Sequence, residues 1–458
     1  MQDQSQRPGS ATDIPGAPKP EDRLPFARTI ELRGHIIDSH LLGQVMDVVM
    51  DSSAEFYIEK FDVGRHRDDP SYARLALHAA TPNALEDLVV AVGRLGAQLL
   101  EGEETDARTA PAPADGVLPD GFYCTTNMPT EVRAAGRWLR VERIEMDVAI
   151  ALRIGPDLTP LGAYTAPMAE VREGVPVVVG YEGVRMQPIE RPRSPAMIGS
   201  SSRATQGHGF HFMSSAVSSE RPQAAAIHEL AERMRTIRDN GGRTLVVGGP
   251  AIIHTGAGPQ LEAMIREGYI RLLFAGNALA AHDIESALYG TSLGVSLDAH
   301  SEGAAAEHGH EHHLRTINTI RAHGGIRAAV EQGVLTRGIM YECVRCATPY
   351  VLAGSIRDDG PLPDVITDVI EAQHAMREHI QSEAGVDLAL LMGTTLHSIA
   401  VGNLLPASVP TVCVDINPAV VTKLLDRGSL QTAGLVIDAG GFLHQLASEL
   451  QLKFGAGH

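Results

Sequence analysis

The sequence predicts an α/β protein whose C-terminal part, residues 206–458, forms a Rossmann-like, doubly wound parallel sheet. Two observations predict this fold. Short apolar runs, among them TLVVG, LLFAG, LALLM and TVCV, alternate with helical segments along this part of the chain. Glycine, small residues or hydrogen-bonding side chains follow nearly every run, as expected where the strands of an open sheet end at a ligand site.

Two smaller domains are expected before this sheet. Residues 1–25 are rich in Pro, Gly and Gln and are predicted to be a disordered tail. Residues 26–114 follow the order strand, helix, strand, strand, helix, which predicts a ferredoxin-like α+β domain. Residues 115–205 contain short β-like runs such as RWLRVE and predict a small, barrel-like β domain. The Pro- and Ser-rich stretch 190–209 is predicted to be a linker or mobile loop.

Composition excludes several classes of partner. The formal net charge of the 458-residue chain is −18 at pH 7, which argues against binding to nucleic acid or to an anionic membrane surface. Four cysteines are too few and too scattered for a disulfide framework. We find neither a signal peptide nor an apolar stretch long enough to span a bilayer. We therefore expect a cytoplasmic protein without a membrane or nucleic-acid partner.

An acid at the end of an apolar run, Asp415, suggests a nucleotide site. It follows Gly393 by about 20 residues, the spacing at which the acid of a dinucleotide-binding unit accepts hydrogen bonds from ribose hydroxyls. A carboxylate there favours NAD over NADP, and the helix that begins near Thr394 would offer N–H groups to the pyrophosphate. The turn is GTTLH and not G-x-G-x-x-G, so a second interpretation stays open, in which Asp415 only caps the helix after Pro418.

Several long motifs resemble one family. They are FARTIELRGHIIDSHLLGQVMD, GFYCTTNMPTEVR, GPAIIHTGA, FAGNALAAHDIESALYGTSLG, VLAGSIRDDGPLPDVITDVI and CVDINPAVVTKLLDRGS. Over roughly residues 26–450 the chain resembles the archaeal-type ornithine cyclodeaminases, a family also described as the LOR/SDH bifunctional enzyme conserved region. The resemblance implies conversion of L-ornithine to L-proline and ammonia, with a bound NAD that takes a hydride from the substrate and returns it within one cycle. It also implies a homo-oligomer.

The resemblance further implies which residues contact NAD. All of them lie at the predicted strand ends. They are Asn277, Ala278, Asp359, Thr394, Thr395, Leu396, His397, Asp415, Asp438 and Ala439.

The implied reaction needs a base for the attacking amine, an acid for the departing ammonia and a group that holds the α-carboxylate. We expect Asp358 and Asp359 to supply the base or to anchor an ammonium group, since adjacent carboxylates in a cleft can divide acid and base roles between them. Alternatively, one of them caps the next helix or only meets the cofactor. Arg357 either clamps a carboxylate or pairs with Asp358. His397 is the remaining catalytic candidate.

Histidines recur near the predicted strand ends. His254, His282 and His397 each lie there, and we expect one of them to contact the substrate. The segment HGHEHH has a composition that suits transition metals. We interpret it as a loop that leads into a helix, and we expect no metal.

Two other functions stay open. An opine- or saccharopine-type amino-acid dehydrogenase would use the same cofactor with net turnover and would accumulate NADH. A non-catalytic, nucleotide-bound sensor would use the N-terminal domain to detect an amino acid. The many ionisable groups at strand ends argue against the sensor, because burying such groups without a task is costly.

Overall fold

The computed structural model describes residues 23–34, 36–37, 41–66, 69–93, 95–99, 105–186, 223–292, 295–296, 309–358, 360–426 and 432–452. Most of the predicted tail, the whole stretch predicted as a linker after residue 190, and Asp359 lie outside these residues. The chain divides into two compact units. The first is Met1–Asp106 with Tyr181–Glu190, and the second is Ala107–Gly180 with Arg191–His458.

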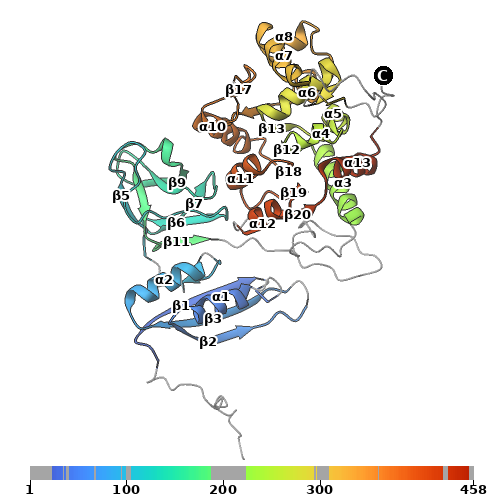
Figure 1. The fold of residues 1–458 in the computed structure, drawn as a ribbon. Helices are drawn as coiled ribbons and strands as arrows, with labels where there is room; N and C mark the ends of the chain where they lie inside the picture. Colours follow the sequence, from blue (N-terminus) through green and yellow to red (C-terminus); the bar gives the residue numbers. More distant parts are fainter. Residues whose placement is uncertain are drawn as a thin grey trace, which may run out of the picture. The chain divides into compact units, whose positions relative to one another are not determined.

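The first unit has the predicted ferredoxin-like topology (Figure 1). Its strands and helices are β1 (Phe26–Gly34), α1 (Leu41–Asp51), β2 (Glu55–Asp62), β3 (Ser71–Ala79), α2 (Pro82–Gly93) and β4 (Gln98–Leu99). The sheet order is β2-β3-β1-β4, with antiparallel neighbours throughout. Residues alternate between buried and partly exposed along much of β3, and the buried ones pack with Val45 and Val49 of α1. β11 (Val184–Met186) follows in the returning segment of this unit.

The first part of the second unit is the predicted β-rich domain. Its strands are β5 (Arg108–Pro111), β6 (Thr130–Ala134), β7 (Arg137–Glu142), β8 (Ala149–Ile154), β9 (Pro160–Ala166) and β10 (Pro176–Val179). They run in the order β6-β7-β9-β8-β10-β5, and only β7 and β9 pair in parallel among them. Small buried side chains such as Ala149, Ala151 and Val177 form its core. The sheet is therefore a half-barrel, as the short Gly-punctuated runs indicated.

The rest of the second unit contains the predicted parallel sheet. Its strands are β12 (Thr244–Gly248), β13 (Leu272–Gly276), β16 (Tyr350–Ala353), β17 (Val365–Ile366), β18 (Leu388–Met392), β19 (Thr411–Asp415) and β20 (Thr432–Val436). The order is β17-β16-β13-β12-β18-β19-β20, and every neighbouring pair is parallel. A separate small hairpin pairs β14 (Thr291–Ser292) with β15 (Val295–Ser296).

Helices cover both faces of this sheet, which makes it doubly wound (Figure 1). Each face of the sheet has its own core: Val246 packs in one cluster of buried side chains, and Leu245 and Val247 pack in the other. Because both faces are buried, the strand sequences are almost continuously apolar. The helices that contribute to the first cluster are α3 (Gln223–Asp239), α4 (Ala251–His254), α5 (Gly258–Arg266), α6 (Asn277–Tyr289), α7 (Gly309–Ala322), α8 (Ile326–Glu331), α9 (Ile339–Arg345) and α13 (Ala439–Glu449). Those of the second are α10 (Val369–Ile380), α11 (Thr395–Leu404) and α12 (Pro418–Asp426).

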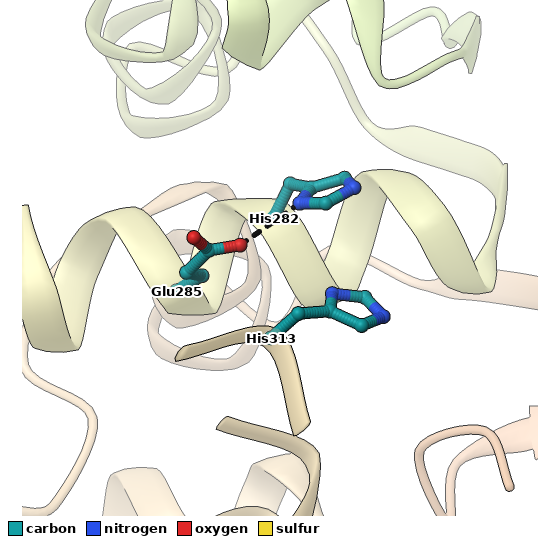
Figure 2. A group of neighbouring side chains, drawn as sticks. All are labelled: His282, Glu285 and His313. Carbon is teal, nitrogen blue, oxygen red and sulfur yellow. Dashed lines mark hydrogen bonds and ion pairs between the residues drawn. The ribbon is translucent and has the colours of Figure 1, made fainter. Parts of the chain in front are cut away.

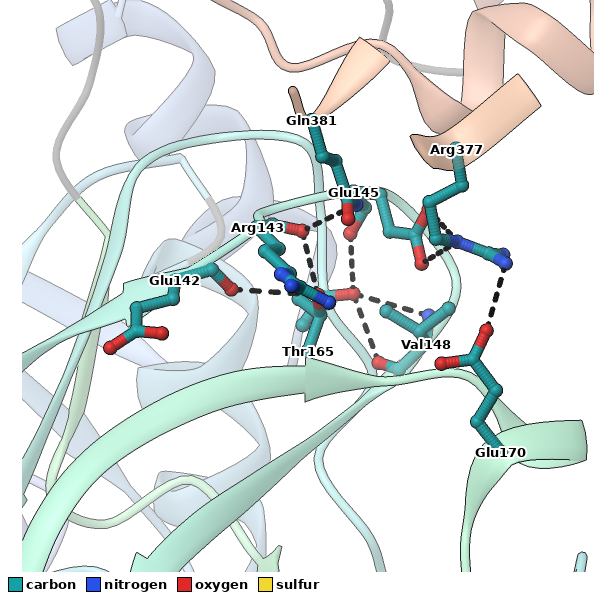
Figure 3. Close-up of polar contacts among 9 residues, drawn as sticks. Glu142, Arg143, Glu145, Val148, Thr165, Glu170, Arg377 and Gln381 are labelled. Carbon is teal, nitrogen blue, oxygen red and sulfur yellow. Dashed lines mark hydrogen bonds and ion pairs between the residues drawn. The ribbon is translucent and has the colours of Figure 1, made fainter. Parts of the chain in front are cut away.

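Polar contacts hold the half-barrel against the parallel-sheet domain (Figure 3). Arg377 on α10 donates from Nε to both carboxylate oxygens of Glu145, at 3.0 and 2.9 Å. Its Nη1 lies 3.2 Å from Glu170 Oε1. Backbone bonds add to this contact, for example Met146 N–H to the carbonyl of Asn403 at 2.9 Å. The C-terminal end of α11 is thereby fixed to the half-barrel. No helix among the described residues is both long and apolar enough to cross a membrane.

Candidate functional site

The strand order defines where a ligand would bind. From β12 the chain proceeds to β13 and β16 on one side, and it then returns to β18, β19 and β20 on the other side. This reversal between β12 and β18 is a topological switch point, and in open parallel sheets a ligand binds in the crevice outside the carboxyl ends of the strands at such a point. The candidate site residues are therefore considered by their positions along this edge.

The loops after β12 and β18 approach each other very closely at the switch point. Gly249 donates its N–H to the carbonyl of Met392 at 2.9 Å. A Cβ added to Gly249 would lie 1.9 Å from the carbonyl oxygen of Gly393, and Gly393 itself has a φ of +63°. Only glycine satisfies both conditions without strain. The result is a backbone-lined floor at the crevice, although the sequence lacks the usual G-x-G-x-x-G pattern.

The first turn of α11 follows this floor and carries four predicted NAD contacts. Thr394 is the N-cap residue, but its side chain makes no capping bond and instead lies 3.2 Å from His397 Nδ1. Thr395 and Leu396 begin the helix, so their N–H groups have no intrahelical acceptor. The side chain of Leu396 is 75% exposed, which is unusual for a leucine at the edge of a core. This turn can accept an anion, with an apolar surface beside it.

His397 has both ring nitrogens engaged by protein atoms. Its Nε2 lies 3.3 Å from the carbonyl oxygen of Ala353. Because a carbonyl only accepts, Nε2 carries the hydrogen, and Nδ1 is left as the acceptor for the hydroxyl of Thr394. His397 thus connects α11 to the end of β16 across two intervening strands. This bonding favours a positioning role over proton transfer.

Asp415 lies at the end of β19, where the spacing from Gly393 predicted it. Its Oδ1 accepts a hydrogen bond from Asn417 N–H at 2.8 Å, and Asn417 in turn accepts one from Ala419 N–H in the first turn of α12. Asn417, not Asp415, is therefore the side chain that caps α12. No residue that the structure describes donates to Asp415 Oδ2. Beside it, Ile416 is 72% exposed, so a free carboxylate oxygen and an uncovered apolar side chain stand together.

The last predicted pair of cofactor contacts follows β20. Asp438 is the N-cap of α13, and its Oδ2 accepts from Gly441 N–H at 2.9 Å. Ala439 is the first residue of that helix and is buried. The capping bond accounts for an aspartate at this position without a ligand.

On the other side of the switch point, Asn277 and Asp358 meet. Asn277 opens α6 directly after β13 and is 4% exposed, and Ala278 follows it on the helix. The Oδ1 of Asn277 accepts from Leu362 N–H at 3.0 Å, and its Nδ2 lies 3.5 Å from Asp358 Oδ1. Asp358 also accepts from Ser355 N–H at 2.8 Å. The loop after β16 is therefore held over the start of α6 by these two side chains.

Arg357 lies next to Asp358 in the same loop and is exposed. It forms no ion pair within the described residues, so the pairing with Asp358 that the sequence allowed is not observed among them. The alternative, a clamp for a substrate carboxylate, stays a prediction. Asp359 lies outside the described residues.

Three histidines and a glutamate gather on α4, α6 and α7, and Figure 2 shows His282, Glu285 and His313 of this group. The ring centroid of His282 lies 4.9 Å from that of His254 and 4.9 Å from that of His313. Glu285 is completely buried, and its Oε2 lies 3.0 Å from His282 Nδ1. The hydroxyl of Thr291 donates to the other carboxylate oxygen at 3.0 Å.

Electrostatics differ among the three imidazoles. Burial lowers the pKa of His254 below its ordinary value, and so does the neighbouring His282, while Glu285 opposes the change. Burial and His282 likewise lower the pKa of His313, against which Glu285 and Asp358 act. Both rings are therefore neutral near pH 7. The influence of Asp358 on His313 also links this cluster to the substrate side of the edge.

The cluster has donor atoms of the kind that bind transition metals, since one ligand atom from each of His282, Glu285 and His313 lies within 4.8 Å of the others. Both oxygens of Glu285, however, already accept hydrogen bonds from His282 and Thr291. The hydrogen bonding favours a proton-transfer cluster over a metal centre.

Sequence reasoning named His254 and His282 but missed Glu285. His313 ends the HGHEHH segment, which was interpreted as a loop leading into a helix; that interpretation was wrong, because α7 already begins at Gly309 and includes His313. Glu285 follows His282 by three positions on α6, the spacing at which two side chains share a helix face. That spacing was the available signal. His313 lies on a different helix, and no pattern in the sequence indicates that α7 packs against α6 at this point.

Comparisons with known proteins agree with this fold. Residues 27–128 match the family described as the LOR/SDH bifunctional enzyme conserved region. Residues 129–227 and 228–446 match the first region and the Rossmann fold of the C-terminal part of ArgZ-like arginine dihydrolases.

Relatives cover almost the whole chain. The ornithine cyclodeaminase of Methanothermobacter thermautotrophicus is 50% identical over 94% of this chain and 99% of its own length. That of Methanopyrus kandleri is 51% identical over 92% of this chain and 97% of its own. The crystal structure of ArgZ, an arginine dihydrolase of the ornithine–ammonia cycle in cyanobacteria, matches 93% of this chain at 39% identity with a TM-score of 0.77, although the chain spans only 58% of that longer protein. The chain therefore belongs to the archaeal-type ornithine cyclodeaminase family, which carries the LOR/SDH bifunctional enzyme conserved region.

Proposed function

We propose that this protein is an NAD-dependent ornithine cyclodeaminase, which converts L-ornithine to L-proline and ammonia. The observation that carries the proposal is that a backbone-lined floor and a polar cluster lie at the same edge of the sheet. The floor is formed by Gly249, Gly393 and the first turn of α11, and Asp358 and the histidines lie across the switch point from it. The names of the relatives supply the reaction.

Three features of the edge support NAD as the cofactor. Gly249 and Gly393 pack backbone against backbone at the switch point, as the glycines of a dinucleotide-binding turn do. The first N–H groups of α11 would bind the pyrophosphate. Asp415 Oδ2 would accept from the adenosine ribose, with Leu396 and Ile416 as exposed apolar side chains beside the adenine, and a carboxylate at this point repels a 2′-phosphate.

The remaining predicted contacts take supporting roles. We infer that Thr394 and Thr395 line the phosphates. Asn277 and Ala278 would lie beside the nicotinamide half, and Asp438 and Ala439 would meet the adenosine half. His397 would hold the ends of β16 and α11 together around the cofactor. We retain Asp359 as a cofactor contact on the family resemblance alone.

NAD supplies a reversible two-electron acceptor for the hydrogen on the substrate's α-carbon. The chain's own residues must bind and orient the diamino acid. Asp358 is held by Ser355 N–H and faces Asn277, so we assign it to an ammonium group of the substrate. Arg357 is exposed one residue away, and we assign it to the α-carboxylate. Together they would orient the substrate along the edge of the sheet.

The test is to incubate the purified protein with L-ornithine and NAD⁺, to assay proline and ammonia, and to follow absorbance at 340 nm. Proline and ammonia without accumulation of NADH are the expected result. Steady NADH formation would indicate an amino-acid dehydrogenase instead, and no turnover with ornithine would remove the substrate assignment.

A matched pair of variants tests the role of Asp358. Asp358→Asn should raise the KM for ornithine by about tenfold or more, because a charge-assisted hydrogen bond is lost. Asp368→Asn is the control, since Asp368 also accepts backbone N–H groups but does so at the start of α10, among residues not assigned to the site. Equal KM values in the two variants would contradict the assignment.

A further inference from the structure

One buried pair of side chains, His282 and Glu285, has no role in the function proposed above. On α6, the side chain of His282 is 7% exposed and that of Glu285 is not exposed at all. Removing a carboxylate from water is costly unless hydrogen bonds and a compensating charge accompany it. Glu285 has hydrogen bonds at both oxygens, from His282 and from Thr291. Of these two partners, His282 is the one that can take up a proton and carry a positive charge.

The hydrogen bonds determine the state of the imidazole. A carboxylate only accepts, so Nδ1 of His282 must carry the hydrogen that is directed at Glu285. In the neutral ring, Nε2 is then left with its lone pair. The second oxygen of Glu285 accepts from the hydroxyl of Thr291, which fixes the carboxylate plane and thereby the ring that bonds the first oxygen. The pair is an oriented base with one reactive nitrogen.

Other titratable groups face His282 from the neighbouring helices. His254 faces it from α4, and His313 faces it from α7. On α7, His312 also lies 3.0 Å from the hydroxyl of Thr291. Burial lowers the pKa of His254 and that of His313, so both of these rings favour the neutral form. Glu285 bonds His282 directly, and a carboxylate that accepts from Nδ1 orients that ring.

The cluster also lies at the correct edge of the sheet for the reaction. His254 ends α4, the short helix that follows β12. His282 lies a little more than one turn after Asn277, which opens α6 after β13. Asp358 is near enough to influence His313, and it bonds Asn277. The residue assigned to the substrate amine and the histidine cluster therefore both follow strands at this edge of the sheet.

We propose that His282, positioned by Glu285, is the catalytic base and acid for the two amino groups of the substrate. This inference rests on the proposed function. The lone pair of His282 Nε2 forms an N–H bond with a proton of the substrate's side-chain ammonium, and the broken N–H bond leaves its electron pair on the amine nitrogen. That amine attacks the α-carbon of the protonated α-imino acid, and the new C–N bond forms as the C=N π pair moves onto the α-nitrogen. The new ring nitrogen loses its extra proton to solvent, and His282 returns its own proton to the α-amino group. The lone pair of the ring nitrogen then forms the C=N bond of the cyclic imine as ammonia departs with the old C–N bonding pair, so no net proton or electron is gained by the protein.

Glu285 is a positioning residue in this scheme, and the pH profile separates that role from a purely structural one. In Glu285→Gln the amide no longer stabilises the protonated imidazole. The acid limb of kcat/KM should therefore move to lower pH by about 1 unit or more, since a neighbouring opposite charge changes a pKa by about 1–3 units. Glu285→Asp keeps the charge and should keep the limb near its original pH. His282→Gln should reduce kcat by about 10²-fold or more, with NAD binding unchanged.

The chain offers a matched control. His228 Nδ1 lies 2.8 Å from Glu449 Oε2, in the same atomic arrangement, but on the exposed surface between α3 and α13. His228→Gln and Glu449→Gln should leave both the rate and the pH profile unchanged.

The experiment measures proline formation by these variants between pH 5 and 9, with NAD binding by calorimetry and a chelator-treated sample of the wild type in parallel. Addition of free imidazole to His282→Ala should restore part of the rate. An unmoved acid limb in Glu285→Gln, or full activity in His282→Gln, would overturn the assignment. The assignment would also be overturned if chelation abolished the wild-type activity and added zinc restored it, because the cluster would then act as a metal centre. A wild-type protein that forms no proline would instead refute the proposed function.

Discussion

The ion pair between the half-barrel and α10 permits a quantitative prediction, in which Arg377 is replaced by Met. The side chain of Glu145 is 1% exposed, and that of Arg377 is 12% exposed. Glu170, the second partner of Arg377, is 41% exposed. Arg377→Met therefore leaves one buried carboxylate without its cation and one exposed carboxylate that water can solvate (Figure 3).

The magnitude follows from the burial of the two acids. Removal of one partner of a buried ion pair costs about 3–5 kcal/mol, whereas an exposed pair contributes at most about 1 kcal/mol. Burial already raises the pKa of Glu145 although Arg377 opposes the change, so in the variant this carboxyl takes up a proton more easily. Protonation limits the loss, and we expect about 3 kcal/mol at pH 7. Glu170→Gln should cost less than about 1 kcal/mol.

The pH dependence has a defined sign. A carboxyl whose folded pKa is raised contributes stability that is present below its ordinary value of 4.5 and is lost as the pH rises through the folded value. Without Arg377 the folded pKa of Glu145 rises further. The difference between wild type and Arg377→Met should therefore be smaller at pH 5 than at pH 7.

The assay is urea unfolding followed by tryptophan fluorescence. The single tryptophan of the chain, Trp138, lies on β7 of the half-barrel, close in sequence to Glu145, and so reports on this part of the molecule. The double variant Glu145→Leu with Arg377→Met should recover most of the loss, because two apolar side chains replace two charges. Equal effects of Arg377→Met and Glu170→Gln, or no recovery in the double variant, would refute the reasoning.

Three further predictions concern the carboxyl edge and α6. Asp415→Ser should weaken NAD binding by about tenfold or more and reduce the preference over NADP, as measured by calorimetry with both nucleotides. Gly249→Ala should abolish NAD binding and destabilise the fold by about 1–3 kcal/mol, since its Cβ would collide with the carbonyl of Gly393; tight binding at normal stability would contradict this. Burial raises the pKa of Asp283 from 3.8 to about 7, although the N–H groups of α9 oppose the change. The stability that this carboxyl contributes should therefore be lost as the pH rises from about 4 through 7. In Asp283→Asn, the free energy of unfolding measured in urea should depend less on pH across that interval.

Much of the architecture was predictable because the strand periods are unambiguous. The alternating runs of residues 26–79 and the buried runs such as LALLM each have a regular pattern, and the ferredoxin-like and doubly wound sheets followed from their order. The spacing of Asp415 from Gly393 correctly indicated a strand, helix, strand unit that ends in an acid. These inferences need only the type and order of the elements along the chain, not the side-chain contacts between distant ones.

The proton-transfer cluster was harder to predict, for a physical reason. The spacing along α6 alone indicates that Glu285 faces His282. The burial of Glu285, however, depends on Thr291 and on the segments that pack over α6. His313 meets His282 only because α7 lies across α6, about 30 residues later in the chain. The capping of α12 by Asn417 was likewise missed, because Asp415 and Asn417 both suit a turn and only the geometry of their backbone bonds distinguishes them.

Helix α6 sets the spacing between several residues that hold or form the site. Its first residue, Asn277, holds the loop after β16, its middle carries the His282–Glu285 pair on one side, and Asp283 accepts the first N–H groups of α9 on another side. Each residue advances the helix by about 1.5 Å and turns it by about 100°. One residue inserted between Asn277 and His282 would shift the side chains of His282, Asp283 and Glu285 along and around the helix axis. They would then no longer face the groups that they contact now. We expect this helix to tolerate many conservative replacements but no change in length.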